Sequence, residues 1–163
     1  MTQQHPPILE TCQLAWADEA ACAAAAQRLA RAPGLREAFV ELEGPLGAGK
    51  TTFARHLLQA LGVQGRIKSP TYAVVETYEL PGPAISHFDF YRFDDPQEWE
   101  DAGLRDLFGA AGLKLVEWAE KARPLLPVPD LRVTLAPRDG NERAVQVDAW
   151  TPRGAQLLEN MRS

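Results

Sequence analysis

A glycine-rich stretch at residues 44–51 constrains this sequence more than any other feature. It reads GPLGAGKT and matches the pattern G-x-x-x-x-G-K-[ST], with the required residue types at Gly44, Gly49, Lys50 and Thr51. Glycines allow the backbone to curl so that successive N–H groups point at one anion. In such loops the lysine reaches the β- and γ-phosphates, and the threonine hydroxyl ligates Mg²⁺. The stretch therefore predicts a site for the phosphates of a nucleoside triphosphate.

The segments on both sides of this loop support the prediction. Residues 39–42 are a short, mainly apolar run typical of a strand, and apolar residues in 51–61 recur with helical spacing. Gly62 is a natural stop for that helix. The positive end of the helix dipole would then face the phosphates. The residues predicted to bind the nucleotide are Leu46, Gly47, Ala48, Gly49, Lys50, Thr51 and Thr52.

The rest of the chain alternates strand and helix signals. Strands are predicted at residues 8–14, 39–42, 72–80, 84–90, 113–118, 131–136 and 144–150. A helix is predicted over the alanine-rich residues 20–26, capped by Asp18, and a short one runs from Asp95-Pro96 to Gly103. The last two strands read as an antiparallel hairpin. We predict an α/β fold, with a P-loop NTPase-like mixed sheet flanked by helices, as a single domain over residues 1–163.

Composition and charge narrow the choice of partners. The chain has 163 residues, a formal net charge of −5, and no apolar run near the roughly 20 residues that span a bilayer. Residues 1–7 lack the basic start and apolar centre of a secretory signal, so a cytoplasmic protein is expected. The negative charge argues against a protein that grips nucleic acid through a broad basic surface. Cys12 and Cys22 lack metal-binding spacing, and we expect small, buried apolar side chains there.

Two carboxylates lie among apolar strand residues, where a P-loop enzyme places a second contact with Mg²⁺. Asp89 lies in the sequence HFDFYR and Glu117 in LVEW. A buried carboxylate is costly unless it is paired or bound to a metal. The alternatives are structural ion pairs, of Asp89 with Arg92 and of Glu117 with a nearby lysine. Glu117 could also orient the attacking water.

Other polar residues favour a structural interpretation when taken alone. Thr71, in the sequence SPTY, could sense the γ-phosphate as switch loops do, but a Ser-Pro turn leading into a strand is simpler. His56 and His87 are isolated histidines, for which a surface or core position is expected. The chain has no Asn-Lys-x-Asp motif for guanine, since neither Asn141 nor Asn160 begins one. This favours ATP as the nucleotide.

Four sequence blocks together resemble a known family. They are GPLGAGKTTF at 44–53, SPTY at 69–72, HFDFYR at 87–92 and VEWAEK at 116–121. The set is similar to the bacterial TsaE family, also called YjeE. The resemblance implies a P-loop fold with weak intrinsic ATPase activity, required for the threonylcarbamoyladenosine modification at position 37 of tRNA. It implies the TsaD and TsaB proteins as partners whose turnover ATP hydrolysis supports. It implies tRNA contact at most through that complex, and no binding of DNA or a membrane.

The resemblance also assigns roles by position. It places phosphate and Mg²⁺ at Lys50 and Thr51, the acids near the metal at Asp89 and Glu117, and a switch-like threonine at Thr71. The predicted catalytic residues are Lys50, Thr71, Asp89 and Glu117, and the predicted metal ligands are Thr51, Asp89 and Glu117. His56 and Ala119 depart from the family pattern, where Gly and Pro are common, at positions not expected to touch phosphate.

Two other classes of function share part of this pattern. A small-molecule kinase of the shikimate- or adenylate-kinase type has the same loop, but it needs an arginine-rich lid, and the arginines between residues 92 and 143 are scattered. A binding module could use ATP only as a switch. It differs from an ATPase mainly in whether hydrolysis matters.

Overall fold

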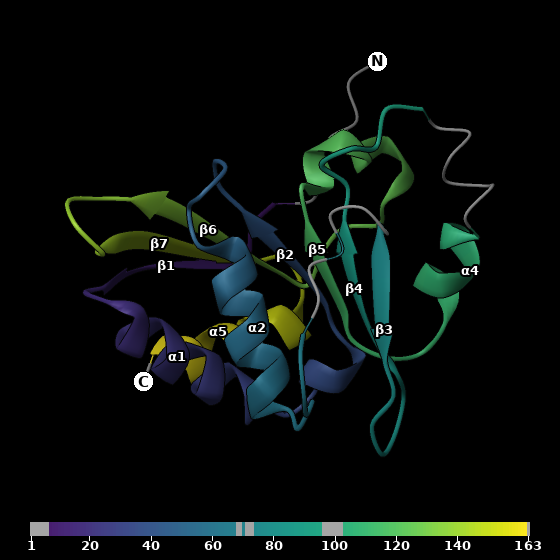
Figure 1. Cartoon of the computed structure of the whole chain (residues 1–163), viewed down its shortest axis with the longest axis horizontal. Coiled ribbons are helices and arrows are strands. Elements are labelled where there is room, and N and C mark those ends of the chain that lie inside the picture. Colours follow the sequence, from purple (N-terminus) through teal and green to yellow (C-terminus); the bar gives the residue numbers. More distant parts are fainter. Residues whose placement is uncertain (1–6, 68–69, 71–73, 96–102, 163) are drawn as a thin grey trace.

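One mixed β-sheet of seven strands organises the chain (Figure 1). The computed structural model describes residues 7–67, 70, 74–95 and 103–162. Across the sheet the strands follow the order β1-β7-β6-β2-β5-β4-β3. Their bounds are Glu10–Trp16 (β1), Phe39–Glu43 (β2), Val75–Tyr78 (β3), Ile85–Asp89 (β4), Lys114–Glu117 (β5), Leu131–Pro137 (β6) and Arg143–Ala149 (β7).

Parallel strands occupy the middle of the sheet, and antiparallel strands complete its two ends. β2 pairs in parallel with both β5 and β6, and β4 pairs in parallel with β5. The pairs β1–β7, β6–β7 and β3–β4 are antiparallel. Every residue of β4 and β5 is buried, as expected for parallel strands covered on both faces. The predicted mixed sheet with a C-terminal antiparallel hairpin is confirmed.

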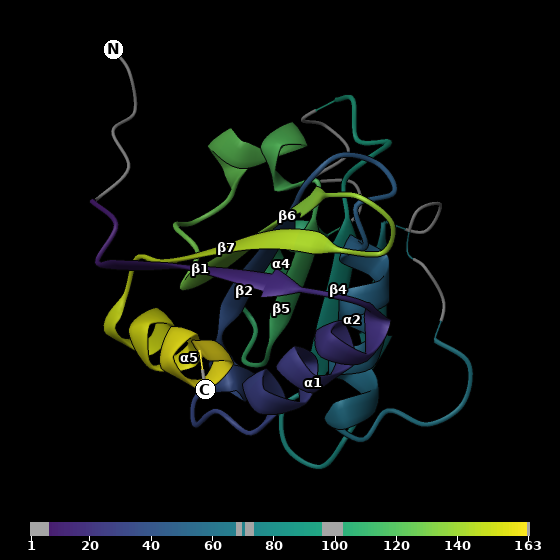
Figure 2. The same ribbon diagram turned by 90° about the vertical axis from the view of Figure 1, so that its left-hand side faces the viewer.

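Three helices cover one face of the sheet. α1 (Glu19–Ala30), α2 (Lys50–Ala60) and α5 (Pro152–Arg162) lie on the same side of the strands (Figure 2). Their apolar residues join those of the strands in the larger buried cluster, where Leu29, Leu57 and Leu158 are fully buried. Burial of each such side chain stabilises the fold by roughly 1.5–3 kcal/mol. In the described ranges, no helix is long and apolar enough to cross a membrane.

The opposite face carries a smaller cluster rich in phenylalanine. Successive residues of a strand point to opposite faces, so Val40 joins the larger cluster and Phe39 the smaller one. Phe88 on β4 packs on Phe108 of α4 (Leu104–Gly109), with 4.5 Å between ring centroids. Two 3₁₀ turns after β5, at Ala119–Lys121 and Arg123–Leu125, complete this side.

Several predicted elements are confirmed, with shifted bounds. Asp18 caps α1, because its Oδ1 atom accepts a hydrogen bond of 2.9 Å from the Ala21 amide. The predicted edge strand at residues 8–14 is β1, which ends two residues later at Trp16. Cys22 is buried as expected, whereas Cys12 on that edge strand is only partly buried. The predicted helix after Asp95 falls mostly outside the described residues. Gly103, expected to end it, instead directly precedes α4.

The sequence patterns missed α4 and the C-terminal helix α5. α5 is short, polar on one side and contains Gly154, which lowers its helical signal. Two tertiary features fix it in place. The Thr151 hydroxyl accepts a hydrogen bond of 3.0 Å from the Gly154 amide, and this caps the helix. A Cβ atom at Gly154 would clash with the carbonyl oxygen of Asp130, so the helix approaches the start of β6 closely.

The register of the central strands brings the predicted site together. Leu42 on β2 is level with Glu117 on β5, and Glu117 is level with Asp89 on β4. Because these strands are parallel, their carboxyl ends meet at one edge of the sheet. Ligands of open α/β sheets bind outside that edge. The loop that follows β2 therefore begins beside both acids.

Candidate nucleotide-binding site

The glycine-rich loop connects β2 to the first residue of α2, as the sequence predicts. Gly44 has a φ of +147°, and a Cβ atom there would clash with the Leu135 carbonyl oxygen on β6. A glycine is thus required for the chain to leave β2 past its neighbouring strand. Gly49, with a φ of +104°, precedes Lys50 at the start of α2. The amino end of α2 faces the cavity formed by the loop, where an anion is favoured.

Lys50 is buried at the centre of this loop. Its Nζ atom donates a hydrogen bond to the Gly44 carbonyl oxygen and lies 3.5 Å from the centroid of the Trp118 ring. Burial lowers the pKa of Lys50, and the nearby carboxylates of Glu117, Glu120, Asp89 and Glu43 act in the opposite direction. Trp118 is one of two described non-glycine residues with positive φ, at +59°. In the sequence, the only indication that Trp118 lies at the site is its position directly after Glu117.

Glu117 links the loop helix to the next strand along the sheet. Its Oε1 atom accepts a hydrogen bond of 3.0 Å from the Thr51 hydroxyl. Its Oε2 atom lies 2.7 Å from Nε2 of His87 on β4. Glu117 and His87 are each 1% exposed. The sequence alternatives paired this acid with a lysine and gave the histidine a surface or core position, whereas the structure pairs the two residues with each other.

The two ring nitrogens of His87 have different surroundings. Its Nδ1 atom is buried and has no hydrogen-bond partner among the described residues. A carboxylate oxygen can only accept a hydrogen bond, so Nε2 carries the proton toward Glu117. His87 therefore fixes the orientation of the Glu117 carboxylate from the side opposite Thr51.

Asp89 occupies the corresponding position at the end of β4. It is 4% exposed, and its Oδ1 atom accepts a hydrogen bond of 2.9 Å from the Tyr91 amide. The roles of Asp89 as a metal ligand and, alternatively, as the ion-pair partner of Arg92 both stay predictions. Thr71 lies outside the described residues, so its predicted switch role also stays a prediction.

The predicted residues line one cavity of about 300 Å³, called here the phosphate pocket. Six of the seven predicted loop residues line it, and so do the two acids. Its lining residues are Leu46, Gly47, Gly49, Lys50, Thr51, Thr52, Asp89, Tyr91, Glu117, Trp118 and Arg143. Ala48, the seventh, is fully buried and lines a neighbouring cavity instead.

The oxygen donors of the phosphate pocket suit Mg²⁺. The Thr51 hydroxyl already lies within hydrogen-bond distance of Glu117, and Asp89 is on the adjacent strand. Mg²⁺ at nucleotide sites is held by one or two carboxylates together with phosphate oxygens and water, so a full protein cage is unnecessary. No group of three or more His, Cys, Asp or Glu side chains in the described ranges could hold a metal by itself.

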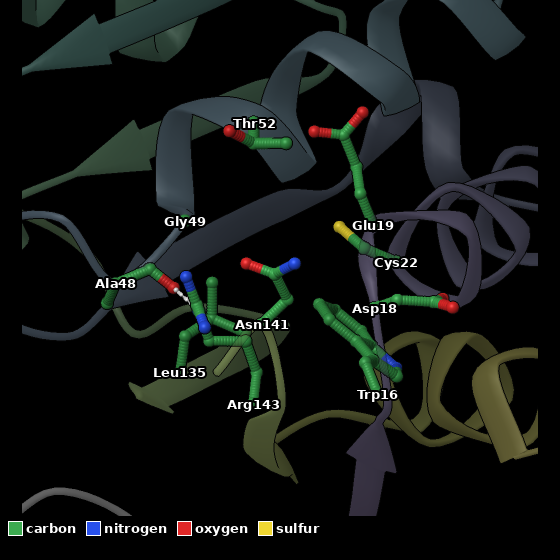
Figure 3. A pocket seen from close by; sticks show the side chains of 10 residues that line it. All are labelled: Trp16, Asp18, Glu19, Cys22, Ala48, Gly49, Thr52, Leu135, Asn141 and Arg143. Carbon is green, nitrogen blue, oxygen red and sulfur yellow. Dashed lines mark hydrogen bonds between the residues drawn. The ribbon is translucent and has the colours of Figure 1, made fainter. Parts of the chain in front are cut away.

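A second cavity of about 190 Å³ adjoins the phosphate pocket (Figure 3). We call it the side pocket. Gly49, Thr52 and Arg143 line both cavities. Its other lining residues are Trp16, Asp18, Glu19, Cys22, Ala48, Leu135 and Asn141. Trp16 is held flat against Phe53 of α2, with 5.2 Å between ring centroids. Sequence reasoning missed this cavity, because its walls come from the β1–α1 junction and from the β6–β7 hairpin.

The fold and the site together define a protein of the P-loop type. Residues 16–145 match the family model described as threonylcarbamoyl adenosine biosynthesis protein TsaE. The chain is 44% identical over 120 residues to the tRNA threonylcarbamoyladenosine biosynthesis protein TsaE of Haemophilus influenzae, covering 74% of this chain and 75% of that one. It is 36% identical to the TsaE protein of Bacillus subtilis, with the same coverage.

A solved structure agrees with these sequence matches. The crystal structure of Bacillus subtilis YdiB superposes with a TM-score of 0.77 and 27% identity, over 94% of this chain and 95% of that one. The chain belongs to the TsaE family of tRNA threonylcarbamoyladenosine biosynthesis proteins. The resemblance inferred from the four sequence blocks is confirmed.

Proposed function

We propose that this protein is the ATPase of tRNA threonylcarbamoyladenosine modification, and that it hydrolyses ATP to support turnover of a TsaD–TsaB complex. The observation that carries the proposal is the hydrogen bond between Thr51, at the start of α2, and Glu117, at the end of β5. It joins the phosphate loop to a buried acid in one cavity, which is the arrangement that hydrolysis of a magnesium-bound triphosphate needs. Membership of the TsaE family supports the pathway.

In this proposal the loop holds the β- and γ-phosphates. Its backbone N–H groups and the amino end of α2 provide a positive field, and Lys50 leaves the Gly44 carbonyl to reach the phosphate oxygens. Thr51 and the two acids would hold Mg²⁺, which would supply positive charge against the charge that develops on the phosphates. Glu117 also orients water for attack on the γ-phosphate, and His87 keeps that carboxylate in one position.

The side pocket fits the base and ribose of the nucleotide. It adjoins the phosphate pocket through Gly49 and Thr52, so one ligand can occupy both cavities. Trp16 and Leu135 offer apolar surface, and the amide of Asn141 offers a donor and an acceptor for a base edge. We propose ATP as the nucleotide, on the strength of the missing guanine motif and the family.

The partners are proposed from the family alone. TsaD and TsaB would dock on this chain and raise its weak ATPase activity in the cytoplasm. The net charge of −5 favours contact with tRNA through the complex rather than through this chain. The kinase alternative loses support, since family membership points to the modification pathway instead. A binding module that uses ATP only as a switch is distinguished from an ATPase by measuring ATP turnover.

The test is ATP turnover by this protein alone, with TsaD and TsaB, and with small-molecule acceptors such as shikimate or AMP. We expect slow hydrolysis alone and marked stimulation by the TsaD–TsaB complex. Stimulation by an acceptor, with phosphate transferred to it, would establish the kinase. Tight ATP binding without any turnover in the complete mixture would establish the switch and overturn the proposal.

A further inference from the structure

Arg143 is a cationic residue that the site contains and that no sequence pattern singled out. It is the first residue of β7, far from the glycine-rich loop in the chain. In the sheet, Arg143 pairs with Trp16 on β1 and with Pro137 on β6. This pairing places it next to the glycine-rich loop, where it contacts Ala48. It lines both the phosphate pocket and the side pocket. A nucleotide that spans the two cavities must pass this guanidinium group.

Two hydrogen bonds fix the guanidinium group of Arg143. Its Nε atom donates to the Ala48 carbonyl oxygen over 2.9 Å, and its Nη1 atom donates to the Glu142 carbonyl oxygen over 3.0 Å. Figure 3 shows the group against the loop at Ala48. In the described part of the chain, the Nη2 atom has no such partner. The planar group is thus held in place with donors still free for an anion, as suits phosphate binding.

The charges around the phosphate pocket also favour an anion-binding role for Arg143. Among its lining residues, the cations are Lys50 and Arg143, and the anions are Asp89 and Glu117. Without Arg143, one lysine would face two carboxylates and a polyanionic ligand. Lys50 projects from the start of α2, where the β- and γ-phosphates are expected. Arg143 stands at the junction of the two cavities, where the phosphate next to the ribose would lie.

We propose that Arg143 binds the α-phosphate of the nucleotide within the same chain. This inference rests on the proposed function, because it assumes a nucleotide with its base in the side pocket. A purely structural role is the competing explanation: Arg143 would only join the hairpin to the loop through Ala48. The two roles differ in whether the side chain of Arg143 contacts the α-phosphate directly.

The first measurement is the affinity for ADP and ATP by titration calorimetry, in the wild type, Arg143→Gln, Arg143→Lys and Arg138→Gln. Arg138 lies on the same hairpin, is exposed and lines neither cavity, so its variant controls for the change in net charge. A lost hydrogen bond to a charged group corresponds to roughly a tenfold to hundredfold change in affinity. We expect that loss for ADP and ATP alike in Arg143→Gln, a smaller loss in Arg143→Lys, and none in the control.

The second measurement is ³¹P nuclear magnetic resonance of bound ADP at saturating concentration. We expect the α-phosphorus resonance to differ between the wild type and Arg143→Gln, and the β-phosphorus resonance to stay nearly unchanged. Equal affinities in wild type and both Arg143 variants would overturn the inference. So would a loss confined to ATP, or a change of the β-phosphorus resonance alone. Absence of nucleotide binding by the wild type would instead overturn the proposed function on which the inference rests.

Discussion

The Nζ atom of Lys50 lies 3.5 Å from the centroid of the Trp118 ring, so the lysine of the phosphate loop rests on an aromatic face. The two residues come from different elements, α2 and the turn after β5. A cation on an indole face is attracted by the ring, by about 0.5–2 kcal/mol. The contact therefore connects the phosphate loop to the segment that begins with Glu117 and continues into the two 3₁₀ turns.

A nucleotide should disturb this contact, because its phosphates draw Lys50 away from the ring. Trp16 lines the proposed site of the base, so the measurement is made in a Trp16→Phe background. In that background we expect a change of tryptophan fluorescence when ATP or ADP is added, and most of that change should come from Trp118. The variant Trp118→Phe should lose it, whereas Trp150→Phe, which removes a tryptophan outside both cavities, should keep it. An undiminished signal in Trp118→Phe would place the disturbance elsewhere.

Lys50→Ala should abolish nucleotide binding or turnover while the protein stays folded. Burial lowers the pKa of this lysine, which means that burying its positive charge destabilises the folded state. Removal of the charge therefore should not unfold the protein. Calorimetry should show at least a tenfold to hundredfold loss of ATP affinity. Lys121→Ala, at an exposed position after β5, is the matched control. An unchanged affinity in Lys50→Ala would refute the phosphate assignment.

Glu117→Ala should lower ATP hydrolysis more than nucleotide affinity. The loop amides and Lys50 remain to bind phosphate, but the carboxylate that contacts Thr51 and His87 is lost. A positioned acid or base contributes roughly 10²–10⁴-fold to a rate, and we expect a loss in that range in the presence of partners. Glu79→Ala, at an exposed position outside both cavities, should behave as the wild type. Equal turnover in Glu117→Ala would indicate a structural role.

Glu41→Ala should destabilise the fold without touching the nucleotide site directly. Glu41 on β2 is 1% exposed and accepts hydrogen bonds from Arg123, at 3.0 Å, and from Arg132, at 2.9 Å. Its loss leaves the two partly buried arginines with the more exposed Glu43 as their remaining acidic partner. We expect a drop of about 2–4 kcal/mol in the free energy of unfolding, measured with urea. Glu79→Ala, on the exposed surface, should shift it by less than about 0.5 kcal/mol.

The thiol of Cys22 should lose its proton at a higher pH in the folded protein than in the unfolded chain, and this should lower the stability of the fold in alkaline solution. Burial raises the pKa of this thiol from its ordinary 9.0 to about 11. The unfolded chain therefore loses this proton near pH 9 while the folded chain keeps it to about pH 11. Because the folded state binds more protons in that window, its stability from this group decreases as the pH rises.

Alkylation with iodoacetamide measures the titration of Cys22 directly. In the background Cys12→Ala, the rate should rise with an apparent pKa near 11 in the folded protein and near 9 in denaturant. Saturating nucleotide should slow the reaction further, since Cys22 lines the side pocket. A folded-state rate that already levels off near pH 9 would contradict the burial argument.

Features of this protein that depend on neighbouring residues were predictable, whereas features that depend on contacts between distant segments were not. The loop at 44–51, the helix after it and the cap at Asp18 were predicted because each depends on residues within one or two turns of one another. The acids Asp89 and Glu117 were predicted as candidates, but their juxtaposition depends on strand order and register. α5 was missed because its helical signal is weak and its position depends on packing against the start of β6.

The sequence by itself determined that this chain has a glycine-rich loop of the P-loop pattern between a strand and a helix, because glycine conformations and helix amides are properties of a short segment. The four ordered blocks also determined the family. Only the tertiary structure decided that Glu117 pairs with Thr51 and His87. It also decided that Lys50 lies against the ring of Trp118, and that Arg143 lines both cavities. Those contacts join residues from separate strands and loops, and they exist only once the sheet has set the order and register of its strands.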